Sequence, residues 1–258
     1  MHRLPALKPE DALIAIDSGN SRIKAGLFVR GRLLQLYRAP RAHAPEPHRL
    51  RTWLQSESRP KRAMCLETAR LPDAWSSWLK AFRVELYFFP ESARRLPPTD
   101  YQQPRSWGAD RQAACLGAQK RFPRQDLLIV DAGTCITYDL WTGPGRQRGG
   151  AISPGMRMRL KSMHAFTAGL PEAPMPPVGC PMLGRSTYQA LQSGVLHGAA
   201  FEIQSFFRRW QRNFPQLKLV LSGGDAPYLS PLIENRIFAE PNLNLHGLYQ
   251  SLDPSYAA

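Results

Sequence analysis

The same short design occurs twice in this chain, about one domain length apart. In Ala12–Phe28 an apolar run ends at an aspartate, turns through Ser18 and Gly19, and resumes as an alternation of apolar and polar residues. The stretch "DLLIVDAGTCITYDLW", residues 126–141, repeats the apolar run, the aspartate, the glycine and a hydroxyl residue. Apolar runs of this length suit buried strands, and glycine suits a reversal. The repeat therefore predicts an internal duplication into two similar domains.

Each of these turns is suited to binding phosphate. Glycine lets backbone N–H groups approach an anion, Asn20 and Ser21 add short polar side chains, and Lys24 can neutralise anionic oxygens. A carboxylate such as Asp17 beside phosphate requires a cation between them. For the first motif alone, an ordinary hairpin whose Asp17 and Asn20 stabilise their own turn is the alternative. Two such turns predict a cleft that holds a nucleotide's phosphates from both sides.

The two halves also share an order of elements. The first half predicts strands at 12–17, 22–29 and 32–37, a helix at 48–55, a strand at 61–67, a helix at 73–82 and a strand at 84–89. The second half predicts strands at 127–131, 135–141 and 150–153, followed by helices. We therefore predict an α/β fold with two duplicated domains, residues 1–125 and 126–258, each a mixed sheet with helical cover.

Composition limits the function classes. The chain is 43% hydrophobic and 21% charged, which is typical of a soluble globular protein. No apolar stretch approaches the about 20 residues that cross a membrane, and the N-terminus has prolines and charges where a signal peptide is apolar. We therefore expect a cytoplasmic protein. Four scattered cysteines and six histidines show no metal-ligand spacing, which predicts free thiols and no structural metal.

The chain is strongly basic, with 34 Lys and Arg residues against 20 Asp and Glu and a formal net charge of +14. Basic residues gather in several segments, among them "SRPKR" (58–62) and "PGMRMRLKSMH" (154–164). Such a surface can bind nucleic acid or attract anionic substrates. Because no zinc finger, arginine-rich tail or glycine-aromatic RNA-binding signature occurs, nucleic acid is a disfavoured partner and the charge has no assigned role.

A third motif, "YQQPRSWGADRQAACLGAQKRF", covers residues 101–122. Gly108 breaks the loop, and Asp110 falls near the start of a predicted helix. An aspartate there can be a helix cap or a first-turn charge. It can equally be a general base that takes a proton from a substrate hydroxyl during phosphoryl transfer. Arg111 beside it can pair with an anionic substrate group.

Together these motifs resemble the type III pantothenate kinases, of the actin, hexokinase and acetate/sugar kinase superfamily. "DSGNSRIK" is similar to the family's first phosphate motif, "YQQPRSWGADR" to its substrate motif and "DAGTCITYD" to its second phosphate motif. Similar segments follow in the family's order: "GGAISPGMRMRLKSMHAFTAGLP", "STYQALQSGVLHG" and "LVLSGGDAPYL". The resemblance implies two ribonuclease H-like (actin-like ATPase) domains around a central cleft.

The resemblance also implies a reaction and its residues. The reaction is ATP-dependent phosphorylation of pantothenate to 4'-phosphopantothenate, the first step of coenzyme A biosynthesis, with Asp110 as the general base. The ATP and phosphate contacts would be Asp17, Ser18, Gly19, Asn20, Ser21, Arg22, Ile23, Lys24 and Thr134. The pantothenate contacts would be Tyr101, Gly108, Ala109, Asp110, Arg111 and Thr187. Asp17 would lie near Mg²⁺, and Asp131 would hold a monovalent cation, K⁺ or NH₄⁺.

Assembly and other functions stay open. The family implies a homodimer, and Gly194 and Gly198, four apart in a predicted helix, indicate a close helix contact inside the domain or across a dimer. The alternative function is a non-catalytic transcriptional accessory protein, because some relatives are described in that way and a basic surface suits it. A phosphatase or sugar kinase of the same superfamily is a third alternative, which the motif at 101–111 disfavours. Catalysis is favoured by four intact residues: Asp17, Lys24, Asp110 and Asp131.

Overall fold

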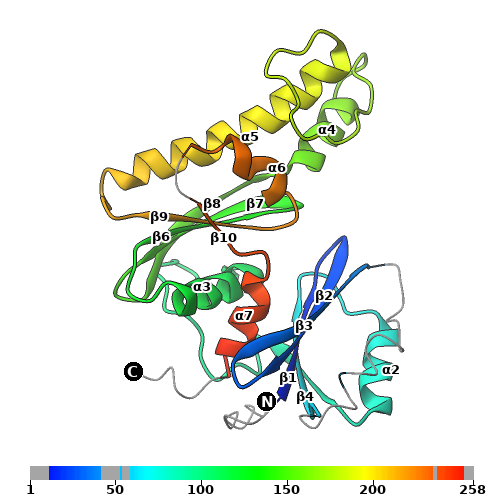
Figure 1. Ribbon diagram of the computed structural model, residues 1–258, viewed down its shortest axis with the longest axis vertical. Coiled ribbons are helices and arrows are strands. Elements are labelled where there is room, and N and C mark those ends of the chain that lie inside the picture. The colour runs from blue at the N-terminus through cyan, green and yellow to red at the C-terminus, as the bar shows by residue number, and fades with distance from the viewer. Residues whose placement is uncertain (1–11, 42–52, 54–58, 235–236, 253–258) are drawn as a thin grey trace. The chain divides into compact units, whose positions relative to one another are not determined.

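The computed structural model describes residues 12–41, 53, 59–234 and 237–252, and divides into two compact units (Figure 1). Unit 1 contains the chain up to Pro98, Gln102–Arg121 and the segment from Leu243 onward. Unit 2 contains Thr99–Tyr101 and Phe122–Asn242. The division thus differs from two contiguous halves that meet at 125/126, because the C-terminal segment belongs to unit 1. The helix predicted at 48–55 lies outside the described residues except for Trp53, which is helical.

The unit 1 sheet has five strands in the order β3-β2-β1-β4-β5. Their bounds are β1 Ala12–Ser18, β2 Arg22–Val29, β3 Arg32–Pro40, β4 Arg62–Glu67 and β5 Glu85–Phe89. β1, β2 and β3 pair antiparallel, whereas β4 runs parallel to both β1 and β5. β1 is buried along its whole length, as its apolar run predicts.

Helices cover both faces of this sheet. α2 (Asp73–Ala81) packs on the face that carries Ile14 and Ile16, where Trp75 is almost completely buried. α3 (Ala109–Arg121) and α7 (Leu243–Gln250) pack on the face that carries Leu13 and Ala15. Successive residues of β1 therefore serve two separate cores, because side chains alternate across a strand. A short 3₁₀ helix, Pro104–Ser106, precedes α3.

α3 and α7 lie side by side in backbone contact (Figure 1). A β-carbon added to Gly117 of α3 would lie 2.2 Å from the Leu243 carbonyl oxygen. One added to Gly247 of α7 would lie 1.8 Å from the Ala113 carbonyl oxygen. Only glycine permits this approach, and the contact explains why the C-terminal segment belongs to unit 1.

Unit 2 repeats the topology of unit 1, with the strand order β10-β9-β6-β7-β8. Its strands are β6 Leu127–Ala132, β7 Cys135–Thr142, β8 Arg146–Pro154, β9 Lys218–Ser222 and β10 Ile237–Ala239. β6, β7 and β8 pair antiparallel, and β9 runs parallel to β6 and β10. The predicted α/β fold with two duplicated units, each a mixed sheet with helical cover, is confirmed.

The long helix α5 provides most of the cover of the unit 2 sheet. Its bounds are Thr187–Gln211, and its buried face, which includes Val195 and Ile203, packs against Leu128 and Val130 of β6. The other helices of this unit are α4 Met156–Ala165, α6 Ala226–Leu229 and the 3₁₀ turn Ser230–Leu232. Among the helices that the structure describes, none is long and apolar enough to cross a membrane.

Candidate active site

The first predicted phosphate turn lies at the end of β1. Asp17 and Ser18 are the last buried residues of this strand, and the Gly19 N–H donates to the Arg22 carbonyl at 3.0 Å, which closes the turn. A β-carbon on Gly19 would lie 3.1 Å from that carbonyl, so glycine keeps the turn tight. Of the remaining predicted phosphate contacts, Asn20, Ser21 and Arg22 are exposed, whereas the Ile23 side chain is in the core.

Ser18 and Arg41 hold this turn against the segment after β4. The Ser18 hydroxyl donates to the Ala69 carbonyl at 2.7 Å, and it accepts from Arg41 Nη1 at 3.0 Å. Arg41 Nη1 also donates to the Gly19 carbonyl at 3.3 Å, and the Arg41 amide donates to the Ser21 carbonyl at 3.0 Å. The side chain of Ser18 therefore shapes the turn from inside the protein. Sequence reasoning missed Arg41, because only the hairpin register brings the end of β3 to this turn.

Asp17 combines burial with nearby charges of both signs. Its burial raises the pKa of its carboxyl group above the ordinary value, and the neighbouring Asp110 carboxylate raises this pKa further. Lys24, directly opposite Asp17 in the β1–β2 pair, and a hydrogen bond from Asn244 lower the same pKa. Burial outweighs both. The carboxylate is therefore held in a place where a cation would stabilise its charged form.

Asn244 is a second residue that sequence reasoning missed. Its Nδ2 donates to Asp17 Oδ2 at 3.3 Å, and its Oδ1 is buried without a hydrogen-bond partner among the described residues. Buried polar atoms are usually satisfied, so this oxygen suits a ligand or a water bound to one. Almost the whole chain separates Asn244 from Asp17, and no motif in the sequence marks it.

Asp110 lies in the first turn of α3, as predicted. Its Oδ1 accepts from the Arg111 amide at 2.9 Å, and a β-carbon on Gly108 would lie 2.7 Å from the same oxygen. Glycine at 108 therefore leaves room for the carboxylate. The structure brings Asp17, Lys24 and Asp110 close enough for their charges to interact. Of the other residues of this motif, Ala109 is half-buried, and Arg111 is buried with only 4% of its surface exposed.

The second phosphate turn lies at the end of β6 in unit 2. Asp131 is half-buried opposite Thr137, and Ser222 lies beside it on β9. Thr134 is exposed in the turn, and its carbonyl accepts from the Gly155 amide at 3.1 Å. The turn therefore has the same place in its sheet as the Asp17 turn has in unit 1.

The remaining predicted contacts lie elsewhere in unit 2. Tyr101 is half-buried on the loop before α3, and its amide donates to Thr99 Oγ1 at 3.0 Å. Thr187 is exposed at the first position of α5, directly after Ser186, whose hydroxyl caps the helix by accepting from the Gln189 amide at 3.3 Å.

The residues around Asp17 fit magnesium that arrives with phosphates. Protein Mg²⁺ sites often use one or two carboxylates, and substrate phosphates and waters complete the shell. Asp17 supplies one carboxylate, Asp110 lies near it, and Asn244 Oδ1 adds an oxygen that is ready to accept from a bound water. In the part of the chain that the structure describes, no group of three or more His, Cys, Asp or Glu side chains could hold a metal ion alone.

Comparison with known protein families gives one match over most of the chain. The model of the type III pantothenate kinase family matches residues 13–209. A type III pantothenate kinase of Flavobacterium johnsoniae is 34% identical over 243 residues, which cover 93% of this chain and 96% of that protein. Its counterpart in Phocaeicola vulgatus is 34% identical over 240 residues, which cover 93% of this chain and 97% of that protein.

Solved structures share the fold at lower identity. A protein of Campylobacter jejuni, described as a conserved Baf family transcriptional activator, superposes with a TM-score of 0.55 and 20% identity. The alignment covers 92% of this chain and 96% of that one. The ethanolamine utilization protein EutJ of Carboxydothermus hydrogenoformans gives a TM-score of 0.51 at 11% identity, over 97% of this chain and 91% of that one. At these identities the likeness shows the fold alone.

Proposed function

The chain belongs to the type III pantothenate kinase family, and from this premise we propose that it transfers a phosphoryl group from ATP to pantothenate, with Asp110 as general base. The product would be 4'-phosphopantothenate, the first intermediate on the way to coenzyme A. One observation carries the assignment of the site: unit 1 brings together the Asp17 carboxylate, the Lys24 ammonium and the Asp110 carboxylate. These groups supply charge neutralisation and a base, which phosphoryl transfer requires.

The proposal gives the Asp17 turn the role of phosphate binding. Backbone amides of the turn and the exposed side chains of Asn20, Ser21 and Arg22 would bind phosphate oxygens, while Ser18 and Ile23 position the turn from the interior. Lys24 would neutralise phosphate charge, and Thr134 would contact ATP. In phosphoryl transfer the protein forms and breaks few covalent bonds itself. Most of its rate enhancement comes from holding the reacting groups in place and stabilising charge.

Two cations belong to the proposal. Mg²⁺, when bound, neutralises charge that develops on the phosphates, and Asp17 and Asn244 would hold it. Asp131 would hold a monovalent cation, K⁺ or NH₄⁺. The Asp131 carboxylate at the end of β6 is half-buried, which supports this assignment. Partial burial makes the charged form less favourable, and a bound cation would stabilise that form.

The proposal assigns pantothenate to residues near Asp110 and to two residues of unit 2. Asp110 would accept the proton of the primary hydroxyl as that oxygen attacks phosphorus. The other contacts would be Tyr101, Gly108, Ala109, Arg111 and Thr187. Arg111 would form an ion pair with the pantothenate carboxylate. Because Arg111 is buried, this carboxylate would lie in the interior of the site.

The decisive experiment is phosphorylation of pantothenate by the purified protein with ATP and Mg²⁺, with K⁺, with NH₄⁺ and without either. We expect product, and faster turnover with a monovalent cation. Glucose serves as a parallel acceptor, and product from glucose alone would favour a sugar kinase. A folded protein that phosphorylates neither acceptor but binds DNA would favour the transcriptional accessory function instead.

Replacing Asp17 by asparagine is expected to abolish phosphorylation and to raise thermal stability of the metal-free protein at neutral pH. Burial raises the folded-state pKa of Asp17, so its ionisation cost is absent below the ordinary value of 3.8 and fully present above the raised value. Asparagine removes that cost. The gain in melting temperature, measured in EDTA, should shrink as the pH is lowered toward 3.8. A variant that is less stable than the wild type at neutral pH would contradict this account.

Homodimer formation is also part of the proposal. Neither Gly194 nor Gly198 on α5 has an atom within 4 Å of an added β-carbon, so no neighbour in the described chain explains these glycines. Glycine within a helix is destabilising, which suggests that a second copy packs there. Large apolar side chains are exposed in the same unit: Ile152, Met158, Phe166, Met182, Leu183 and Phe201.

Gly198→Leu should therefore convert a dimer into a folded monomer. Leucine favours the helix over glycine, so the fold itself should persist, while the added side chain would separate two helices that cross at this position. Light scattering after size exclusion measures the mass, and circular dichroism checks the helix. A monomeric wild type, or an unchanged dimer in the variant, would exclude α5 as the interface.

The proposal places the enzyme in the cytoplasm. ATP is available there, and none of the four cysteines forms a disulfide, which agrees with a reducing compartment.

A further inference from the structure

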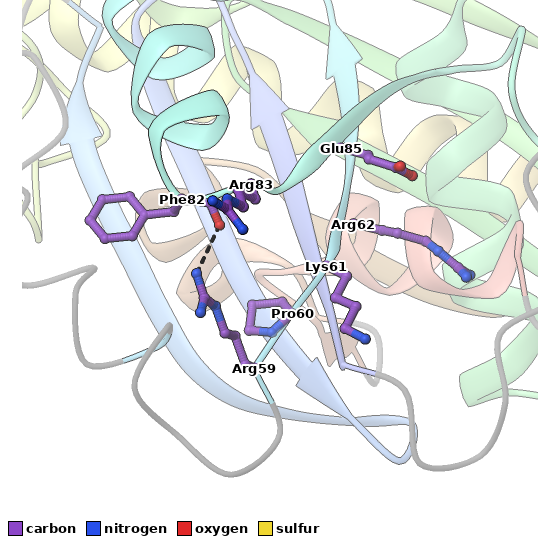
Figure 2. Close-up of a pocket in the computed structure, with 7 residues that line it drawn as sticks. All are labelled: Arg59, Pro60, Lys61, Arg62, Phe82, Arg83 and Glu85. Carbon is purple, nitrogen blue, oxygen red and sulfur yellow. Dashed lines mark hydrogen bonds between the residues drawn. The ribbon is translucent and has the colours of Figure 1, made fainter.

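A basic cavity lies at the end of the unit 1 sheet opposite the Asp17 turn (Figure 2). β1 and β4 run parallel, and Asp17 lies near the end of β1, whereas Arg62 begins β4 beside Leu13. The cavity has a volume of about 400 Å³. Four basic residues line it, together with two apolar residues and one acid: Arg59, Lys61, Arg62, Arg83, Pro60, Phe82 and Glu85. Most of "SRPKR", a segment that the kinase function does not use, therefore lines one concave site.

Among the residues that the structure describes, few carboxylates compensate the positive charge of this cavity. Its one acid, Glu85, accepts from the Tyr87 hydroxyl at 2.6 Å and lies opposite Arg62 in the register of β4 and β5. Arg59, Lys61 and Arg83 form no ion pair with any residue that the structure describes. Four basic residues that share a concave surface with one carboxylate raise the local concentration of anions.

The backbone at Arg83 has a conformation that glycine adopts without strain. After α2 the Arg83 amide donates to the Lys80 carbonyl at 3.0 Å, and the Val84 amide donates to the Leu79 carbonyl at 2.9 Å. This double hydrogen bond is the Schellman motif, which places one residue in the left-handed region and favours glycine there. Arg83 occupies that place with a φ of 58°. Glycine can replace Arg83 at this position without backbone strain, so the contribution of the Arg83 side chain can be measured by removing it.

Arg59 is held in place on the same side of the cavity. Its Nη2 donates to the Phe82 carbonyl at 3.0 Å, and Figure 2 shows this contact beside Arg83. Arg62 and Glu85 extend together from their strands on the other side. Phe82 packs against Trp78, with ring centroids 5.4 Å apart, so the apolar part of the lining is fixed.

We propose that this cavity binds a phosphorylated small molecule of about mononucleotide size. Cavities of about 300–1,000 Å³ suit small ligands, and guanidinium groups match phosphate in geometry and charge. Pro60 and Phe82 provide an apolar surface for the remainder of the ligand. The site would be separate from the proposed kinase turn, and it gives part of the net charge of +14 a role. A concave site of this size favours a small anion over an extended nucleic acid.

The test is calorimetric titration with inorganic pyrophosphate in EDTA. Without a divalent cation the Asp17 carboxylate repels phosphate, so binding under these conditions reports on the cavity. Arg83→Gly should weaken pyrophosphate binding by about tenfold, the effect of one lost charge-assisted hydrogen bond. It should also melt no lower than the wild type, because glycine suits the left-handed backbone. Lys61→Gln, which leaves the backbone unchanged, should weaken binding as well.

Arg124→Gly is the matched control. Arg124 is exposed in unit 2 and has a φ of 57°, so this substitution makes the same changes in charge and backbone away from the cavity. It should leave pyrophosphate affinity within about twofold, since one distant exposed charge is largely screened. Unchanged binding in Arg83→Gly, equal weakening in Arg124→Gly, or tighter Arg83-dependent binding of single-stranded DNA would each overturn the proposal. Both variants should phosphorylate pantothenate normally, so the result stands apart from the kinase assay.

Discussion

Asp110→Asn is expected to lower the rate of pantothenate phosphorylation by about 10²–10⁴, the usual contribution of a general base. Asparagine has nearly the same shape and keeps an oxygen that can accept from the Arg111 amide, now 2.9 Å from Asp110 Oδ1. The start of α3 should therefore be preserved. The loss should appear in kcat, while ATP binding with Mg²⁺ changes little or tightens, because a neighbouring negative charge is removed.

Asp126→Asn is a suitable control for this result. Asp126 lies in unit 2 and accepts from the Gly143 amide at 2.7 Å, so the control makes the same chemical change at a carboxylate that holds a turn. Its kcat should remain near that of the wild type. If Asp110→Asn also keeps its rate, Asp110 is a first-turn residue of α3, and the base must be sought elsewhere.

Gly247→Ala is expected to destabilise the protein by about 3 kcal/mol or more, the upper end of the cost of overpacking, or to prevent folding. The added β-carbon would lie 1.8 Å from the Ala113 carbonyl oxygen and 2.5 Å from its carbon. Both are backbone atoms of α3, so no side-chain rotation relieves the clash, and the two helices must separate. Urea unfolding measures the loss.

The same substitution should weaken the response to nucleotide, because α7 also carries Asn244 to Asp17. A folded Gly247→Ala protein should show a smaller rise in melting temperature on adding ATP and Mg²⁺. Gly169→Ala is the control, since an added β-carbon there meets nothing within 4 Å; its stability should change by no more than about 0.5 kcal/mol. A Gly247→Ala protein as stable as this control would show that α3 and α7 do not pack as described.

The strands and their duplication could be predicted because their signals are local. An apolar run, an aspartate, a glycine and an alternating strand follow one another within a short window in both units. This pattern predicts β1 and β2 in unit 1 and β6 and β7 in unit 2. The position of Asp110 at the start of α3 follows in the same way from Gly108 and the helical pattern after it. The roles of these residues in catalysis remain predictions.

The features that could not be predicted from the sequence depend on contacts between segments far apart in the chain. Asn244 reaches Asp17 from the far end of the chain, and Arg41 reaches Ser18 only through the β2–β3 register. Neither residue belongs to a motif. The assignment of α7 to unit 1 rests on the fit of Gly247 against Ala113, and no periodicity in either helix reveals such a fit.

The place of α7 in the chain has a consequence for biosynthesis. A ribosome makes all strands of the first sheet early, yet the helix that completes the cover of β1 follows the whole of unit 2. At about 5–20 residues per second, the nascent first sheet would wait about 8–30 s with the Leu13 face only partly covered and Asp17 without Asn244. Nucleotide binding at that turn is therefore expected to reach full strength only after α7 has been made.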